Sequence, residues 1–173
     1  NALNGEYLQT IFEDKDEQYV EPVGPAHFLP NSTNEFLWIA QRDGFYHIWK
    51  HNVNNKKAKQ ITKGKFVITA FNGFDAKGEN IYYTSTEVSP LERHYYKHNL
   101  KNGKKVKITK EHGTHNVLPS ASGKYFLDNY SSTDVARNVD IADAKGNFVK
   151  RLHEAVDPLK DYNIGTIELG ELK

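Results

Sequence analysis

The chain has 173 residues, of which 38% are hydrophobic and 26% charged, a balance typical of a folded domain with a packed core and a large wetted surface. The net charge of +1 gives no electrostatic reason to expect nucleic acid or an anionic membrane as a partner. The absence of cysteine excludes disulfides and thiolate zinc sites, and no apolar run approaches the roughly 20 residues of a membrane-spanning helix.

Short strands divided by turn residues, rather than a helical period, run through the whole chain. Gly5–Glu13 is predicted to be a strand, and 163–173 a final one. Between them three series of four strands are predicted: Ala26–Leu29, Phe36–Ala40, Tyr46–Val53 and Lys59–Thr62; Val67–Phe71, Ile81–Ser85, His94–Leu100 and Lys105–Thr109; His115–Leu118, Tyr125–Tyr130, Asn138–Ala142 and Phe148–Leu152. The connections contain the Asn, Asp and Gly residues that short hairpin loops need.

The stretches Lys50–Gly64 and Lys97–Glu111 are near copies of each other, with eight identical residues at an offset of 47 positions. The aromatic runs that begin at Phe36, Ile81 and Tyr125 are spaced by 45 and 44 residues. Four strands per unit at this period are typical of the blades of a β-propeller. We therefore expect an all-β fold, a partial β-propeller of about three four-stranded antiparallel blades.

The division of the chain follows from the repeat. Lysines gather on or beside the predicted fourth strands, which suits the outer edge of a blade, where lysine discourages pairing with another edge. Three blades cannot close a ring that typically has 4 to 8, so we expect the chain to be part of a longer protein. The predicted units are 1–22 as the end of a preceding blade with its crossover, 23–65, 66–111 and 112–154 as blades, and 155–173 as an exit strand or linker.

No motif for self-sufficient catalysis is found. The sequence lacks a G-x-S-x-G nucleophile elbow, a P-loop, an H-E-x-x-H zinc motif and a G-x-G-x-x-G loop. The nearest string to an elbow, SASG, has Ser120 in place of the first glycine. We expect no catalytic residue, no metal and no cofactor in this chain.

Two pairs of histidines have the i, i+4 spacing that would place two zinc ligands together on a helix: His47 with His51, and His94 with His98. On a strand this spacing separates the residues by about 13 Å. The pairs also recur at equivalent positions in two blades, which favours a packing role. His112 and His115 are predicted to lie in a solvated linker between blades.

Several strings together resemble one known family. They are FLW-x-x-x-RDG-x-x-H from Phe36, ITKG from Ile61, ER-H-x-Y from Glu92 and SGKYF-x-x-x-YSS from Ser122. In this order and at these intervals they resemble the C-terminal blades of the propeller domain of dipeptidyl peptidase IV, particularly its Bacteroidetes-type relatives. Members of that family are serine exopeptidases that remove N-terminal dipeptides, and they carry an eight-bladed propeller on an α/β-hydrolase domain.

The resemblance implies which functional residues to expect here. The family's Ser, Asp and His triad belongs to the hydrolase domain, which would follow residues 155–173, and the glutamate pair that grips the substrate amine belongs to an earlier blade. One propeller residue has a match, because the P-x-x-F context beside the substrate pockets is found at Pro25–Phe28. Phe28 is therefore a candidate substrate-binding residue. The alternative is that Phe28 is an apolar first-strand residue that faces the next blade.

Our leading hypothesis is a non-catalytic propeller segment of a dipeptidyl-peptidase-IV-like serine exopeptidase, which gates access of peptide N-termini to the active site and helps to shape the substrate pocket. The resemblance implies as partners a peptide substrate, the protein's own hydrolase domain and a second copy of the parent, in the periplasm or at the cell surface. A tripeptidyl specificity fits the same blades. The alternative hypothesis is a propeller scaffold for protein–protein interaction with no attached hydrolase.

Overall fold

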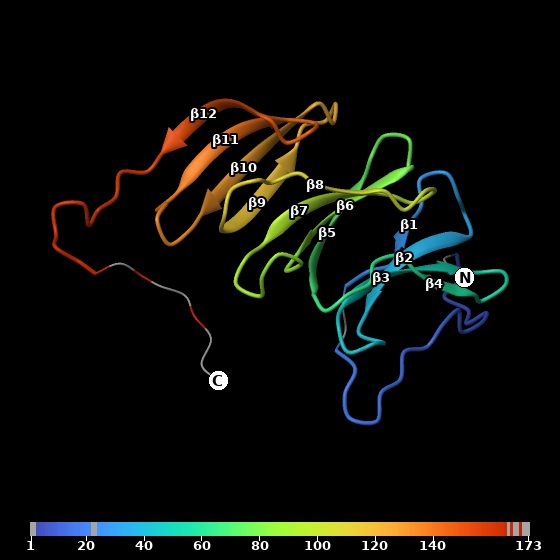
Figure 1. The fold of residues 1–173 in the computed structure, drawn as a ribbon. Helices are drawn as coiled ribbons and strands as arrows, with labels where there is room; N and C mark the ends of the chain where they lie inside the picture. The colour runs from blue at the N-terminus through green and yellow to red at the C-terminus, as the bar shows by residue number, and fades with distance from the viewer. Residues whose placement is uncertain (1–2, 22–23, 166, 168–169, 171–173) are drawn as a thin grey trace.

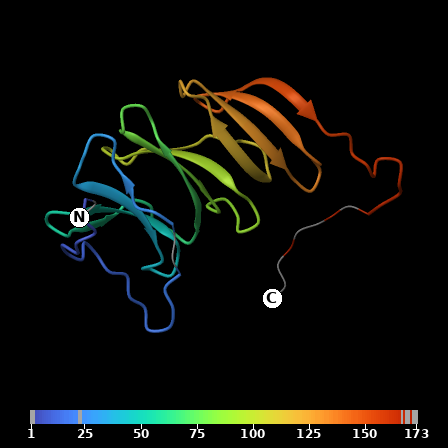
Figure 2. The same cartoon turned by 180° about the vertical axis from the view of Figure 1, so that it is seen from behind.

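The computed structural model describes residues 3–21, 24–165, 167 and 170. These residues contain no helix, and therefore none that could cross a bilayer; their twelve strands form three four-stranded antiparallel sheets. Figures 1 and 2 show the sheets standing side by side in chain order, like neighbouring blades. The predicted all-β fold, a partial propeller of about three blades, is confirmed, and the three sheets do not close into a ring.

Each sheet is a meander in which consecutive strands pair. The first sheet contains β1 (His27–Phe28), β2 (Glu35–Ala40), β3 (His47–Asn52) and β4 (Ala58–Gln60). The second contains β5 (Ile68–Phe74), β6 (Asn80–Ser85), β7 (His94–Asn99) and β8 (Lys105–Lys107). The third contains β9 (Thr114–Pro119), β10 (Tyr125–Ser131), β11 (Asn138–Asp143) and β12 (Phe148–Glu154). All twelve strands predicted for the three blades are found, with ends that differ by at most three residues.

The repeated stretches form equivalent hairpins. Asn52 and Asn99 end β3 and β7, and the side-chain oxygen of each accepts hydrogen bonds from the backbone N–H groups two and three residues later, at 3.0 to 3.2 Å. This local bonding closes the turn without help from the rest of the fold. Gly103 then takes a φ of 72°, and Lys56, at the equivalent position, takes a φ of 54°. The two stretches thus look alike because they build the same outer hairpin twice.

The second sheet is buried on both faces because its neighbours cover it. On β6, Ile81 and Tyr83 point toward the first sheet, whereas Tyr82 points toward the third. The core between the first two sheets is made by Leu37, Ile48, Phe66, Ile68, Ile81, Tyr83 and Tyr96. The core between the second and third is made by Tyr82, Tyr95, Ile108, Val117 and Phe126. Burial of alternate side chains on opposite faces is what holds neighbouring blades together.

Within the described part of the chain, no further sheet covers the outer faces of the first and third sheets. Phe12 lies against the outer face of the first sheet, where its ring is 5.5 Å from that of Phe36 and 4.9 Å from that of Trp38. On the third sheet, Leu118 and Leu127 pair across β9 and β10 on the face away from the second sheet, and Leu118 is 60% exposed. Exposed apolar side chains in a row on a sheet face are typical of a surface that another element covers.

The strand predicted at Gly5–Glu13 is not found, because these residues lie outside every sheet. A strand is defined by its ladder with a neighbour. Phe12 instead packs on the face of the first sheet rather than along its edge. The predicted strand at 163–173 lies largely outside the described residues, and its described residues 163–165, 167 and 170 are not in a strand.

Candidate functional site

Phe28 lies at the end of β1 and is 51% exposed. Its ring packs at 5.5 Å from that of Phe36 on its own sheet. The neighbouring side chain, His27, is the one directed at the next blade, where its ring lies 4.4 Å from that of Phe71. The alternative that Phe28 faces the next blade is therefore wrong. Phe28 thus lies on the face away from the second sheet, and its role as a substrate-binding residue stays a prediction.

A hollow of about 1070 Å³ opens beside the first sheet, between that sheet and the segment 12–21. Its walls include Phe12, Trp38 and Tyr46, so the lining is partly aromatic. Phe28 does not line this hollow, but it is connected to its wall through Phe36, which contacts both Phe28 and Phe12. The aromatic contacts thus continue from the innermost strand to the hollow.

The segment that walls the hollow is anchored by polar contacts. Asp14 accepts hydrogen bonds from Trp38 Nε1 at 2.8 Å and from Arg42 Nε at 2.7 Å. Farther along the segment, Tyr46 Oη donates to Glu21 Oε2 at 2.7 Å. The lining contains the carboxylates of Glu13, Asp14, Asp16 and Glu21 and the cationic groups of Lys15 and Arg42. The hollow is therefore net negative, which favours positively charged ligands.

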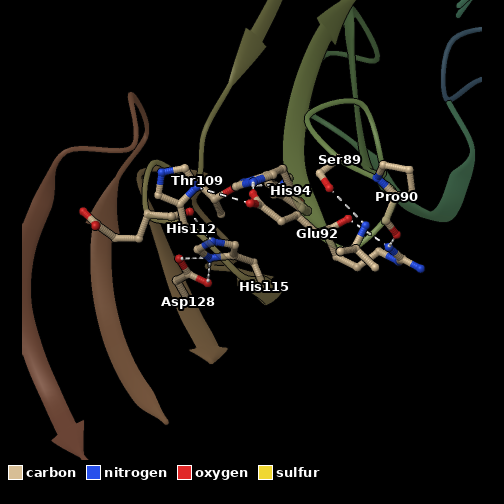
Figure 3. Close-up of polar contacts among 12 residues, drawn as sticks. Ser89, Pro90, Glu92, His94, Thr109, His112, His115 and Asp128 are labelled. Atoms are coloured by element: carbon tan, nitrogen blue, oxygen red, sulfur yellow. Dashed lines mark hydrogen bonds and ion pairs between the residues drawn. The ribbon is translucent and has the colours of Figure 1, made fainter. Parts of the chain in front are cut away.

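A second polar group lies where the second sheet meets the third, at the end of the sheets that also carries the β2–β3 loop. Figure 3 shows Glu92, His94, His112, His115 and Asp128 gathered there. Glu92 lies in the β6–β7 loop and contacts both His94 Nε2, at 2.5 Å, and His112 Nδ1, at 3.2 Å. His115 contacts Asp128 at 2.8 Å.

The positions of the histidines correct one prediction made from the sequence and confirm another. His115 is in β9 and its side chain is fully buried, so it is not part of a solvated linker, whereas His112 is 89% exposed. The packing role predicted for the i, i+4 pairs is confirmed for His51, whose ring stacks on Phe36 at 5.1 Å. Among the described residues no group of His, Cys, Asp or Glu has the arrangement of a metal site.

The architecture and its residues can be compared with known proteins. The family model of the dipeptidyl peptidase IV N-terminal region matches residues 3–137. The chain belongs to this family. Dipeptidyl peptidase 4 of Arthroderma otae is 26% identical over 149 residues, which cover 83% of the chain and 19% of that protein.

Two solved structures show how a chain of this family folds. A dipeptidyl aminopeptidase IV-like protein of Bacteroides ovatus superimposes with a TM-score of 0.87 and 29% identity, over 100% of the chain and 27% of that protein. Porphyromonas gingivalis dipeptidyl peptidase 4 superimposes with a TM-score of 0.71 and 28% identity, over 83% of the chain and 20% of that protein. The chain thus spans about a fifth to a quarter of the length of these dipeptidyl peptidase IV relatives.

For this member of the dipeptidyl peptidase IV family, reasoning from sequence missed the hollow. The stretch EDKDEQYVE, residues 13–21, was interpreted only as a crossover. Its carboxylates, close in sequence to Tyr19, were the available signal. A hollow forms, however, only because Asp14 contacts Trp38 and Arg42, which follow it by 24 and 28 positions. Such a contact between distant positions leaves no local pattern.

Several buried groups of the sheets have shifted pKa values. Burial lowers the pKa of His51 and of His98 below 6.5, their ordinary value. Burial also lowers the pKa of His94, although the hydrogen bond with Glu92 opposes the shift. Burial alone would raise the pKa of Glu92, but hydrogen bonds from His94 and His112 outweigh it and hold that pKa below its ordinary value.

These shifts predict that the chain loses stability in mild acid. A histidine whose folded pKa is lowered binds a proton more readily in the unfolded state, so its contribution is present above about pH 6.5 and is lost as the pH falls. We expect the free energy of unfolding, measured by urea denaturation, to fall between pH 7.5 and 5.5. Each such histidine contributes at most about a tenfold change in the unfolding equilibrium per pH unit.

His98 offers a control for this prediction, since its Nδ1 is buried and has no hydrogen-bond partner among the described residues. His98→Gln removes one of the shifted groups and should make the decline with pH shallower. Equal stability of the parent chain at pH 7.5 and 5.5 would contradict the assignment of neutral, buried rings.

Proposed function

We propose that this chain is the non-catalytic propeller segment of a serine exopeptidase like dipeptidyl peptidase IV, and that it gates access of peptide N-termini to the active site. One observation carries the proposal: the whole chain superimposes, at a TM-score of 0.87, on about a quarter of a much longer dipeptidyl aminopeptidase IV-like protein. The exposed apolar side chains on the outer face of the third sheet, such as Leu118, support it, since a further blade would cover such a face.

In this proposal the segment contributes shape and charge, and the chemistry belongs elsewhere in the whole protein. The chain has no nucleophile elbow, so the catalytic serine would be supplied by an α/β-hydrolase domain. Phe28, half exposed at the end of the first strand, would contact the side chains of the bound peptide. The parent protein would act in the periplasm or at the cell surface and, through a second copy, would form a dimer.

The test compares the chain with the whole protein on a Gly-Pro chromogenic substrate. We expect no turnover by residues 1–173 alone and turnover by the longer protein, whose coding sequence should contain a G-x-S-x-G elbow beyond Lys173. Hydrolysis by the chain alone would contradict the proposal. A longer protein without an elbow and without turnover would instead support a scaffold for protein–protein interaction.

The contribution of Phe28 is tested in the whole protein by Phe28→Ala. Losing the contact of one aromatic face should raise KM for the dipeptide substrate by about tenfold, because one such contact is worth about 1 to 2 kcal/mol, and should change kcat little. Phe148→Ala, on the outer strand β12 and 64% exposed, is the matched control and should leave KM unchanged. Equal KM values for the two variants would show that Phe28 does not contact the substrate, and the assignment of the chain to a propeller would be unaffected.

A further inference from the structure

Two of the buried histidines have hydrogen bonds that suit a neutral ring. The hydroxyl of Thr62 lies 3.1 Å from His47 Nδ1 and accepts from the backbone N–H of Ile48 at 2.9 Å. Its own proton is therefore available to Nδ1, while Nε2 donates to the carbonyl oxygen of Gly64 at 3.0 Å. One ring nitrogen accepts and the other donates, as in neutral imidazole.

His94, at the equivalent position of the second sheet, repeats this arrangement. Thr109 Oγ1 lies 3.0 Å from His94 Nδ1 and accepts from the backbone N–H of Tyr95 at 3.1 Å. His94 Nε2 donates to Glu92, as described above. A single ring proton satisfies every partner of His94.

His115 differs, because both of its ring nitrogens face oxygen atoms that only accept. Nδ1 lies 2.8 and 3.0 Å from the two carboxylate oxygens of Asp128, and Nε2 lies 2.9 Å from the carbonyl oxygen of Glu111. A carbonyl oxygen and an ionised carboxylate have no proton to offer. Both hydrogen bonds are made together only if both nitrogens of His115 carry a proton.

We propose that His115 is a buried imidazolium that forms, with the carboxylate of Asp128, a charged clamp within the third sheet, and that this clamp holds the crossover from the second sheet. The clamp fixes the crossover that joins the sheets, because Glu111 belongs to that crossover and Asp128 to β10. Two backbone hydrogen bonds join the same parts of the chain. The N–H of Arg93 donates to the oxygen of Gly113 at 3.1 Å, and the N–H of His115 donates to the oxygen of Arg93 at 3.0 Å. The β6–β7 loop is thereby held to the third sheet.

The surroundings of His115 fit a positive charge. On one side its ring stacks on Tyr130, with 5.0 Å between centroids, and on another it lies 5.1 Å from the ring of His94, which is neutral in the arrangement above. The pKa of His94 is lowered first by burial and further by Lys107 and by His115 itself. A cation beside His94 keeps that ring neutral, so the two histidines have opposite assignments.

Two other sets of charged residues near this junction are paired. Glu92 contacts His94 and His112, as described above, and Arg151 of β12 holds Asp140 of β11 with two hydrogen bonds, at 2.9 and 3.1 Å. Asp128, only 13% exposed, is left to balance the charge on His115. A buried ion pair of this kind is costly to break by removing one partner.

The first junction of the same chain shows what the clamp replaces. Ile68 pairs with Ser85 at the start of β5, as His115 pairs with Tyr130 in β9. Two residues before those partners stand Tyr83 and Asp128, respectively. Ile68 and Tyr83 belong to the apolar core of the first junction. The third blade thus has a charged pair where the second has an apolar one.

The protonation of His115 can be observed directly in the full chain. Nitrogen-15 spectra of the histidine rings at pH 7 should show two protonated nitrogens for His115 and one for His47, which is the internal control. A singly protonated His115 would overturn the proposal, since Asp128 would then hold the proton.

Two variants separate the clamp from its neighbours. Asp128→Asn should leave His115 with a single ring proton and should speed hydrogen exchange at the backbone N–H of His115 by roughly tenfold or more. Glu92→Gln is the matched control, because it changes a partner of His94 and His112 but none of His115, which should stay doubly protonated. A doubly protonated His115 in Asp128→Asn would show that Asp128 is not its counterion and would contradict the proposed ion pair.

Discussion

Replacing Gly146 by alanine is expected to lower the free energy of unfolding by about 2 to 5 kcal/mol, through backbone strain and overpacking together. Gly146 has a φ of 77°, in the left-handed region that side chains rarely adopt. A Cβ built on it would lie 2.0 Å from the carbonyl oxygen of Ile108, in the second sheet's final segment. Because that oxygen belongs to the backbone, it cannot move aside as a flexible side chain could. The third sheet must therefore shift away from the second to make room for the Cβ.

The measurement is urea denaturation of the parent and variant chains, with Gly103→Ala as the matched control. Gly103 has a similar φ of 72°, in the equivalent turn of the second sheet, but nothing lies within 4 Å of its Cβ position. The control should lose only the cost of strain, about 1 to 2 kcal/mol. Equal losses in the two variants would contradict the close approach of Gly146 to the second sheet.

Phe126→Ala is expected to cost about 3 to 5 kcal/mol, the range for truncating a large aromatic side chain in a core. Phe126 is 1% exposed, and its ring lies 5.8 Å from that of Tyr82 and 5.6 Å from that of Tyr95. Both partners belong to the second sheet, so the cost measures the stacking of two sheets rather than the stability of one.

The adjacent residue provides the control. Tyr125 precedes Phe126 on β10 and is 50% exposed. Tyr125→Ala should change the free energy of unfolding by about 0.5 kcal/mol, as is usual for surface positions. Similar losses at the two positions would mean that β10 does not present alternate residues to the second sheet, and the stacked arrangement would fail.

The negative hollow and the charged clamp lie at the same end of the sheets, where the β2–β3 and β6–β7 loops gather. Asp14 ties the segment 12–21 to the first sheet, and His115 ties the crossover to the third. Loops held in this way present a defined surface, as a part of a gate must.

The strands and their grouping could be predicted because their signals are local. The aromatic, β-favouring run Phe36–Ala40, and the Asn and Gly residues of the hairpin loops, act over a few positions. The copies Lys50–Gly64 and Lys97–Glu111 repeat one hairpin, and repetition is visible without any structure. The prediction of a strand at Gly5–Glu13 was wrong because a strand needs a neighbouring strand to pair with, and the local pattern does not reveal whether such a neighbour is present.

The all-β fold, the period of about 45 residues and the lack of a nucleophile elbow could be inferred from the sequence, since these depend on the kind and spacing of neighbouring residues. The burial of His115 beside Asp128 and the orientation of Phe28 away from the next blade are seen only in three dimensions. The physical reason is that burial and charge pairing depend on contacts between residues far apart in sequence. A histidine in a solvated loop could be hydrogen-bonded by water and would need no charged partner.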